Sequence, residues 1–116
     1  MGSRKQSKYR NKKVVFEGIK FDSIRECNRY QELCLLERTG AIRELRCQVR
    51  IPLTASKNPV RSKKGRQLAY VVDFKYWDVP ERRMRYEDVK GYDTRLSALK
   101  VAVIEAENGI LVEIVR

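Results

Sequence analysis

Two apolar runs joined by a short proline-containing turn constrain this chain most. They cover residues 67–78 and 84–90, and their length and composition predict two strands paired as a hairpin. Asp73 interrupts the first run, where aspartate is depleted because an unpaired buried carboxylate is costly. Asp88 and Lys90 lie in the second run, and strand alternation sends them to the same side. The hairpin therefore predicts two carboxylates and an ammonium on one surface.

That surface has the chemistry of a metal and phosphate site. Mg²⁺ prefers oxygen ligands, and Asp73, Asp88 and the carbonyl of Val89 would supply them. Lys90 would orient an attacking water, stabilise developing charge or act as a general base. Hydrolysis of a phosphodiester needs these functions. The alternative for Asp73 is a structural ion pair with Lys75 or Lys90.

The rest of the chain predicts a single α/β domain around this hairpin. Eight elements are expected: strands 14–16 and 19–21, helix 24–39, strands 42–53, 67–78 and 84–90, helix 95–108 and strand 110–115. Ser23 is the expected N-cap of the first helix and Gly40 its end. Glu26 lies one turn into that helix, where it completes an S-x-x-E capping box or adds a third acid to the site.

Two segments carry the whole net charge of +11. Each is free of acidic residues, and the remaining 15 basic residues are balanced by 15 acidic ones. We predict a flexible basic arm at 1–13, followed by a folded domain at 14–116, and expect both segments to bind nucleic acid. A solubility tail and a solvated loop are the alternative; a membrane surface is disfavoured because no apolar residues are interleaved. The basic residues are Arg4, Lys5, Lys8, Arg10, Lys12 and Lys13 in the arm, and Lys57, Arg61, Lys63, Lys64 and Arg66 in residues 54–66.

Composition excludes several other functions. The chain has no histidine, which excludes His-based triads and general bases, and its three cysteines lack CxxC spacing, so a zinc site is not expected. No apolar stretch approaches the roughly 20 residues that span a bilayer. We therefore expect a cytoplasmic protein with reduced thiols and no membrane partner.

The order of these elements and acids resembles the PD-(D/E)xK nuclease superfamily. More closely, the chain resembles a phage-encoded family of small proteins, long catalogued as a domain of unknown function and similar to archaeal-type Holliday junction resolvases. The resemblance covers about residues 8–116. It rests on Gly18–Ser23, Glu26, Arg29–Tyr30, Leu33, Leu36–Glu37, Gly40–Ile42, Gln48, Tyr70, Asp73–Phe74 and Glu87–Gly91. One departure is Val72, which stands where the superfamily's name has proline.

This resemblance implies a restriction-endonuclease-like αβββαβ core with a mixed central sheet, plus the N-terminal hairpin and basic arm. It implies a Mg²⁺-dependent DNA endonuclease, with Mn²⁺ as a substitute metal and Glu26, Asp73, Asp88 and Lys90 as the catalytic set. Glu26 would join Asp73, Asp88 and Val89 as a metal ligand. Gln48 would face the site, or belong to a solvated polar stripe on its strand. Thr94 and Lys100 would contact DNA from the second helix, although Thr94 is equally an N-cap.

The small size of the chain favours recognition of DNA shape and backbone charge over base sequence. We therefore predict a phage Holliday junction resolvase in the host cytoplasm, acting on branched or double-stranded DNA. Symmetric cutting of a junction requires a two-fold homodimer. Val14, Phe16, Ile19 and Phe21 would form its interface, or instead pack on the core. The alternatives are a flap, branch or nonspecific endonuclease, and a non-catalytic DNA-binding protein.

Overall fold

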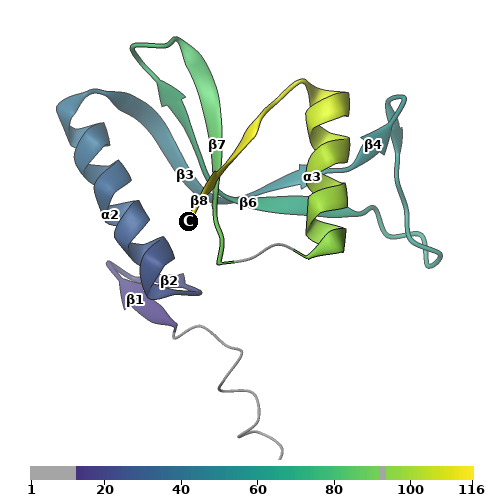
Figure 1. The fold of residues 1–116 in the computed structure, drawn as a ribbon, viewed down its shortest axis with the longest axis horizontal. Helices are drawn as coiled ribbons and strands as arrows, with labels where there is room; N and C mark the ends of the chain where they lie inside the picture. The colour runs from purple at the N-terminus through teal and green to yellow at the C-terminus, as the bar shows by residue number, and fades with distance from the viewer. Residues whose placement is uncertain (1–12, 92–93) are drawn as a thin grey trace, which may run out of the picture.

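The computed structural model describes residues 13–91 and 94–116, and within them the fold is mixed α/β. Five arm residues predicted to bind DNA, Arg4, Lys5, Lys8, Arg10 and Lys12, lie outside the described residues. Two helices accompany a four-stranded mixed sheet in the order β3-β6-β7-β8, with two small hairpins beside it (Figure 1). The elements are β1 (Val14–Phe16), β2 (Ile19–Phe21), α2 (Ile24–Thr39), β3 (Ile42–Pro52), β4 (Thr54–Ala55), β5 (Asn58–Pro59), β6 (Ala69–Asp78), β7 (Arg83–Val89), α3 (Arg95–Asn108) and β8 (Val112–Val115).

The predicted helices and main strands are confirmed, with end shifts of one or two residues. β6 pairs antiparallel with β3 and β7, and β8 is added parallel to β7. Residues 54–66, predicted as a loop, instead contain the β4–β5 hairpin. No helix in the described part of the chain is long and apolar enough to cross a membrane.

Helix α2 begins and ends where its caps place it. The side chain of Ser23 accepts from the amide of Glu26 at 3.0 Å, which satisfies one of the donors left free at a helix N-terminus. Gly40 ends the helix with φ 89°, a conformation that glycine adopts without steric cost. This fixes the N-terminal turn that carries Glu26.

A bulge in β3 changes the predicted alternation of that strand. The sequence pattern grouped Ile42 with the polar positions Glu44, Arg46 and Gln48, opposite Cys47 and its apolar neighbours. In the structure the register with β6 shifts between Arg43 and Arg46, and Glu44 has φ 58°. The extra residue turns Ile42 inward, so it is buried with Cys27 and Phe74.

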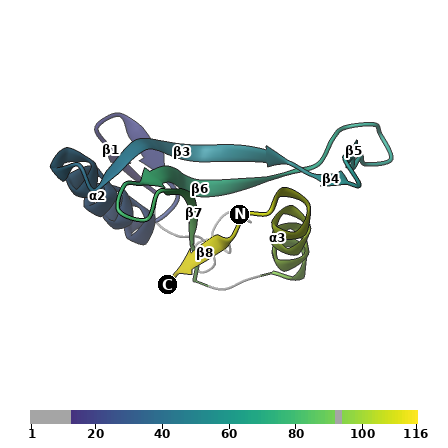
Figure 2. The same ribbon diagram turned by 90° about the horizontal axis from the view of Figure 1, so that it is seen from above.

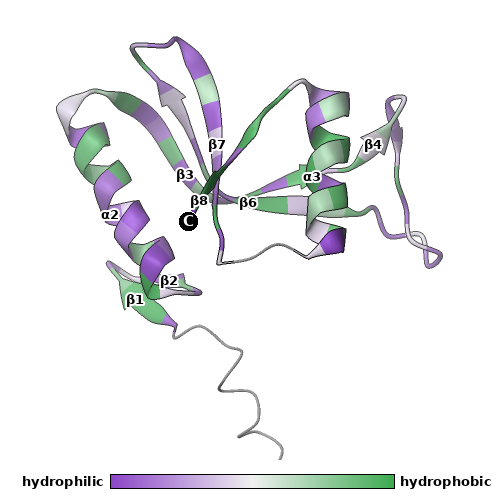
Figure 3. Cartoon of the chain, in the orientation of Figure 1, coloured by the Kyte–Doolittle hydropathy of each residue, from purple (hydrophilic) through white to green (hydrophobic). Residues whose placement is uncertain are grey.

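Both helices pack against the buried side chains of β6. β7 and β8 lie between the two helices (Figure 2). The core is accordingly in two parts. Phe74 and Tyr76 of β6 pack with α2, while Tyr70 and Val72 pack near Ile104 of α3. The two helices also differ in hydropathy. Much of the visible side of α3 is apolar, whereas α2 carries more polar turns (Figure 3). β7 therefore has α2 on one side and α3 on the other.

The N-terminal hairpin packs on the core rather than standing free. Phe21 is 1% exposed, and Val14, Phe16 and Ile19 pack against the cluster beneath α2. The ring of Tyr30 lies 5.1 Å from that of Phe21 and 6.2 Å from that of Phe16. Of the two sequence interpretations, the structure supports packing on the core for these four side chains.

Candidate functional site

The predicted hairpin opens into a fork at its acidic residues. The β6–β7 ladder runs as far as the pair Phe74–Glu87, after which β7 leaves β6 and continues beside β8. At this point the amide of Asp73 donates to Asp88 Oδ1 at 2.9 Å, and the amide of Val89 donates to Asp73 Oδ2 at 2.8 Å. Each carboxylate thus accepts a backbone amide of the opposite strand. We call this point, together with the side chains that gather at it, the fork. It holds Asp73 and Asp88 together as the sequence predicted.

Glu26 reaches the same place from the first helix. Its side chain is 4% exposed and accepts from Gln48 Nε2 at 2.8 Å; the same nitrogen lies 3.4 Å from Asp73 Oδ1. Gln48 therefore bridges a helix carboxylate and a strand carboxylate. It does so from a φ of 54°, which costs free energy for a residue other than glycine. Strain at a polar residue between two acids is typical of a functional site.

Lys90 completes the predicted set on the α3 side of β7. Its Nζ donates to Ser97 Oγ at 3.0 Å and lies 3.8 Å from Asp88 Oδ2. The hydroxyl of Tyr70 is hydrogen-bonded to Asp88, and the Tyr70 ring centroid is 5.4 Å from Nζ. Sequence reasoning missed Tyr70 and Ser97 as site residues. Alternation places Tyr70 on the other side of β6 from Asp73, and a serine in the first turn of a helix carries no signal of its own.

The pKa values at the fork indicate an excess of negative charge. The pKa of Glu26 is raised to about 7, first by burial and then by the charges of Asp73 and Asp22, which together outweigh a lowering by the backbone hydrogen bond of Asp22. The pKa of Asp73 is also raised, first by burial and then by the charge of Asp88. In the described part of the chain, Lys90 is the one cation within 4 Å of a carboxylate of Glu26, Asp73 or Asp88, and it lies near Asp88. The fork thus holds more carboxylate charge than its own cations offset.

The opposite side of β7 is built differently. Glu87, which is 1% exposed, accepts from Arg29 Nε and Nη2 of α2, each at 2.8 Å, and from the hydroxyl of Tyr76. Arg25, four residues before Arg29, donates to the carbonyl of Lys90 at 3.2 Å. The predicted separation of Glu87 from Asp88 by strand alternation is confirmed. These two arginines tie α2 to β7 on both sides of Glu26.

The predicted DNA-binding residues fall into two groups. The first group is exposed on the segment 54–66 that follows β3, which we call the excursion 54–66, and consists of Lys57, Arg61, Lys63, Lys64 and Arg66. Within it, Arg61 Nη1 donates to the carbonyl of Gly65 at 2.9 Å. Lys13 pairs with Asp22 at 3.3 Å. The second group, Thr94 and Lys100, makes local contacts within the fold. Thr94 caps α3 by accepting from the amide of Ser97, and Lys100 Nζ donates to the carbonyl of Ala69 at 3.2 Å.

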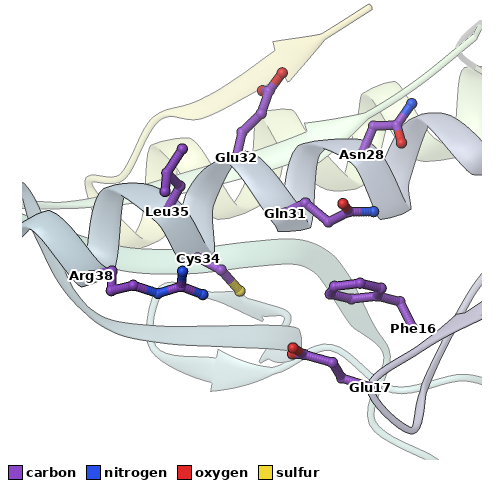
Figure 4. A pocket seen from close by; sticks show the side chains of 8 residues that line it. All are labelled: Phe16, Glu17, Asn28, Gln31, Glu32, Cys34, Leu35 and Arg38. Carbon is purple, nitrogen blue, oxygen red and sulfur yellow. The ribbon is translucent and has the colours of Figure 1, made fainter.

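A separate hollow lies on the outer side of α2. It measures about 400 Å³ and lies between Phe16 and Glu17 of the N-terminal hairpin and side chains of the helix such as Gln31 and Cys34 (Figure 4). None of the residues lining it belongs to the fork. The fork remains the candidate site because it gathers the strained, buried and titratable groups.

The fork supplies oxygen ligands of the kind that a hard divalent cation takes. Asp73 and Asp88 offer carboxylates, and the Val89 peptide lies against the Asp73 carboxylate. As they stand, no three His, Cys, Asp or Glu side chains of the described residues are grouped closely enough to hold an ion by themselves. Mg²⁺ does not require such a group, since it is usually held by one or two protein carboxylates together with waters and phosphate.

Comparison with known proteins identifies the family. The family model described as "Protein of unknown function (DUF1064)" matches residues 6–109, which is most of the chain. The chain belongs to the DUF1064 family. That description assigns no activity, and the DUF1064 match includes every fork residue. No curated protein and no solved structure matches the chain.

Proposed function

We propose that this DUF1064 protein is a Mg²⁺-dependent endonuclease of branched DNA, most specifically a Holliday junction resolvase. The observation that carries the proposal is the fork, where Glu26, Asp73 and Asp88 gather with one lysine and too little positive charge. Buried carboxylates are normally paired with cations or coordinate a metal. The observed element order α2-β3-β6-β7-α3-β8 also matches the αβββαβ order expected of the nuclease core.

In this proposal each fork residue has a stated task. Asp73, Asp88 and the carbonyl of Val89 would hold the metal, which supplies charge neutralisation and an acidified water when bound. Lys90, positioned by Ser97, would contact the scissile phosphate or the attacking water. Glu26 has a pKa of about 7, so it can accept and release a proton at neutral pH, and Gln48 keeps it directed at Asp73.

The substrate assignment follows from charge. The basic segment 54–66 follows β3 directly, and the arm at 1–13 carries a further six positive charges. These positions suit recognition of phosphate backbone and DNA shape, because backbone contacts carry no base information. A junction has two equivalent strands to cut, so we also propose that the protein acts as a homodimer.

A cleavage panel tests the proposal directly. Labelled four-way junction, flap, duplex and single strand are incubated with Mg²⁺, Mn²⁺ or a chelator. We expect metal-dependent cleavage that is fastest on the junction and falls by about 10³-fold in Asp73→Asn, since a metal ligand supplies several kcal/mol of transition-state stabilisation. Junction binding should persist in that variant.

Glu113→Gln is the matched control, because it removes a carboxylate that pairs with Arg85 away from the fork. It should cleave like the unmodified protein. Full cleavage by Asp73→Asn would sink the assignment. Binding of junctions without cleavage under any metal would instead favour a non-catalytic DNA-binding protein whose acids are structural.

A further inference from the structure

The β3–β6 ribbon has a second face, turned away from both helices. On β6, Tyr70, Val72, Phe74 and Tyr76 are buried, so alternation turns the residues between them to the opposite side. These buried residues belong to the clusters that contain α2 and α3 residues, so both helices pack on their side of β6. We call the opposite side the outer ribbon face. Its residues are Arg43, Arg46 and Arg50 of β3 and Val71, Lys75 and Trp77 of β6. Gln48 and Asp73 occupy positions in the same rows, but their side chains bond to Glu26 of α2 and to the amide of Val89 in the fork.

The outer ribbon face concentrates positive charge at a cost in stability. Arg46 lies directly opposite Lys75 in the ladder, and like charges in that position destabilise a sheet. Arg50 donates to the carbonyl of Gln67, and Lys75 lies 5.6 Å from the ring centroid of Tyr86. Neither contact neutralises a charge. A need for solubility alone would not place two cations opposite one another.

Ion pairing elsewhere makes the contrast sharper. Arg29, Arg83 and Arg85 each pair with at least one carboxylate within 4 Å. Among the ion pairs of residues 13–91 and 94–116, none includes a cation of the outer ribbon face. The one carboxylate in its β6 row is Asp73, the fork residue that would bind metal. The face is therefore basic on both sides of Asp73, which occupies the middle of its β6 row.

Its dimensions and charge fit the backbone of a nucleic acid duplex. Trp77 lies six positions after Val71, a span of about 20 Å in a strand. Each strand of a duplex presents a phosphate about every 3.4 Å along the axis, so the face spans roughly six base pairs. Beyond Arg50, β3 leads into the exposed basic residues of the excursion 54–66.

We propose that the outer ribbon face binds the phosphate backbone of a duplex arm and continues into the excursion 54–66. This inference rests on the proposed function in that the duplex is taken to be part of its substrate. The contacts would lie on both sides of Asp73 and so centre the arm on the fork. The recognition would depend on charge spacing and not on base sequence.

A substitution in the like-charge pair of Arg46 and Lys75 should change stability and DNA binding in opposite directions. Lys75→Glu places a carboxylate opposite Arg46, so the melting temperature should rise slightly. Affinity for a labelled 20-base-pair duplex, measured in chelator at 0.1 M salt, should fall by about tenfold. The slope of log affinity against log salt should decrease by roughly one, as expected for one lost phosphate contact.

Arg38→Glu is the matched control, since Arg38 is an exposed residue at the end of α2 beside the outer hollow. It changes the net charge equally and should leave affinity and salt slope within twofold of the unmodified protein. Trp77 is the single tryptophan, so its fluorescence reports on this face directly. We expect DNA to change that fluorescence and to do so less in Lys75→Glu.

Three results would overturn the inference: equal loss of affinity in Arg38→Glu, unchanged affinity in Lys75→Glu, or a Lys75→Glu effect confined to anionic phosphatidylserine vesicles. The two proposals can fail separately because binding is measured without metal. If the protein cleaves junctions and Lys75→Glu binds DNA normally, the proposed binding by the outer ribbon face is refuted and the proposed nuclease function stands. If Lys75→Glu binds DNA more weakly and no form of the protein cleaves it, the nuclease function is refuted and binding by the outer ribbon face stands.

Discussion

The two sides of β7 hold carboxylates one residue apart in very different surroundings. On the α2 side, Glu87 is fully buried and receives two hydrogen bonds from the guanidinium of Arg29. On the fork side, Asp88 accepts from a tyrosine hydroxyl and a backbone amide, and its nearest cation, Lys90, is 3.8 Å away. The first carboxylate is neutralised by its partner. The second shares a single lysine with the neighbouring carboxylate of Asp73.

This difference distinguishes an acid that serves the fold from the acids that we propose to be functional. A buried charge that serves the fold acquires a close counter-charge, because leaving it unpaired is expensive. Glu26 and Asp73 retain raised pKa values instead, so the folded chain carries a cost at neutral pH. A site that binds a cation would be expected to carry such a cost, since the ligand offsets it.

Removing one carboxylate from each side should change stability in opposite directions. Glu87→Gln leaves Arg29 without its buried partner and should lower the free energy of unfolding by about 3 kcal/mol. Asp73→Asn removes a carboxylate whose raised pKa shows that its ionised form is disfavoured, so that variant should be at least as stable as the unmodified protein. Urea unfolding at pH 7.5 measures both. Destabilisation of equal size in the two variants would contradict the comparison.

The pH dependence of stability should expose the fork acid with the higher pKa. Folding raises the pKa of Glu26 from 4.5 to about 7, so between those values the folded state binds more protons than the unfolded state. Stability should therefore fall as pH rises from about 4.5 to 7, and this contribution should level off above 7. Its size is on the order of 3 kcal/mol, since the shift is from 4.5 to about 7 and each pKa unit is worth about 1.4 kcal/mol.

Glu26→Gln isolates this contribution because it keeps the shape of the side chain. The difference in unfolding free energy between that variant and the unmodified protein, followed from pH 4.5 to 8, should grow in favour of the variant. A constant difference across the range would show that Glu26 does not titrate as the geometry at the fork indicates.

Much of this arrangement was predictable from periodicity, and the remainder depended on contacts between distant residues. The helix bounds followed from Ser23 and Gly40, and the separation of Glu87 from Asp88 followed from strand alternation. Periodicity also identified Asp73 as an unusual strand residue. These features are local, so the sequence near each residue was sufficient.

The partners of the fork were not local. Tyr70 meets Asp88 and Ser97 meets Lys90 only because β7 leaves β6 after Glu87. Gln48 was one of several polar residues in an alternating strand until its positive φ and its contacts distinguished it. Neither the divergence of two strands nor an unusual backbone angle at a glutamine has a periodic signature. Such residues emerge from the fold alone.

Magnesium should reduce the cost carried by the fork and leave the Glu87 side unchanged. At pH 7.5, an ion bound at ten times its dissociation constant stabilises the folded state by about 1.4 kcal/mol, which corresponds to a rise of several degrees in melting temperature. The rise should disappear in Asp73→Asn, which removes a ligand, and persist in Glu113→Gln, which removes a carboxylate outside the fork. Calcium, which also takes oxygen ligands, should stabilise the protein in the same variant-dependent way. A magnesium effect of equal size in all three proteins would mean that the ion binds elsewhere, and the uncompensated charge of the fork would need another explanation.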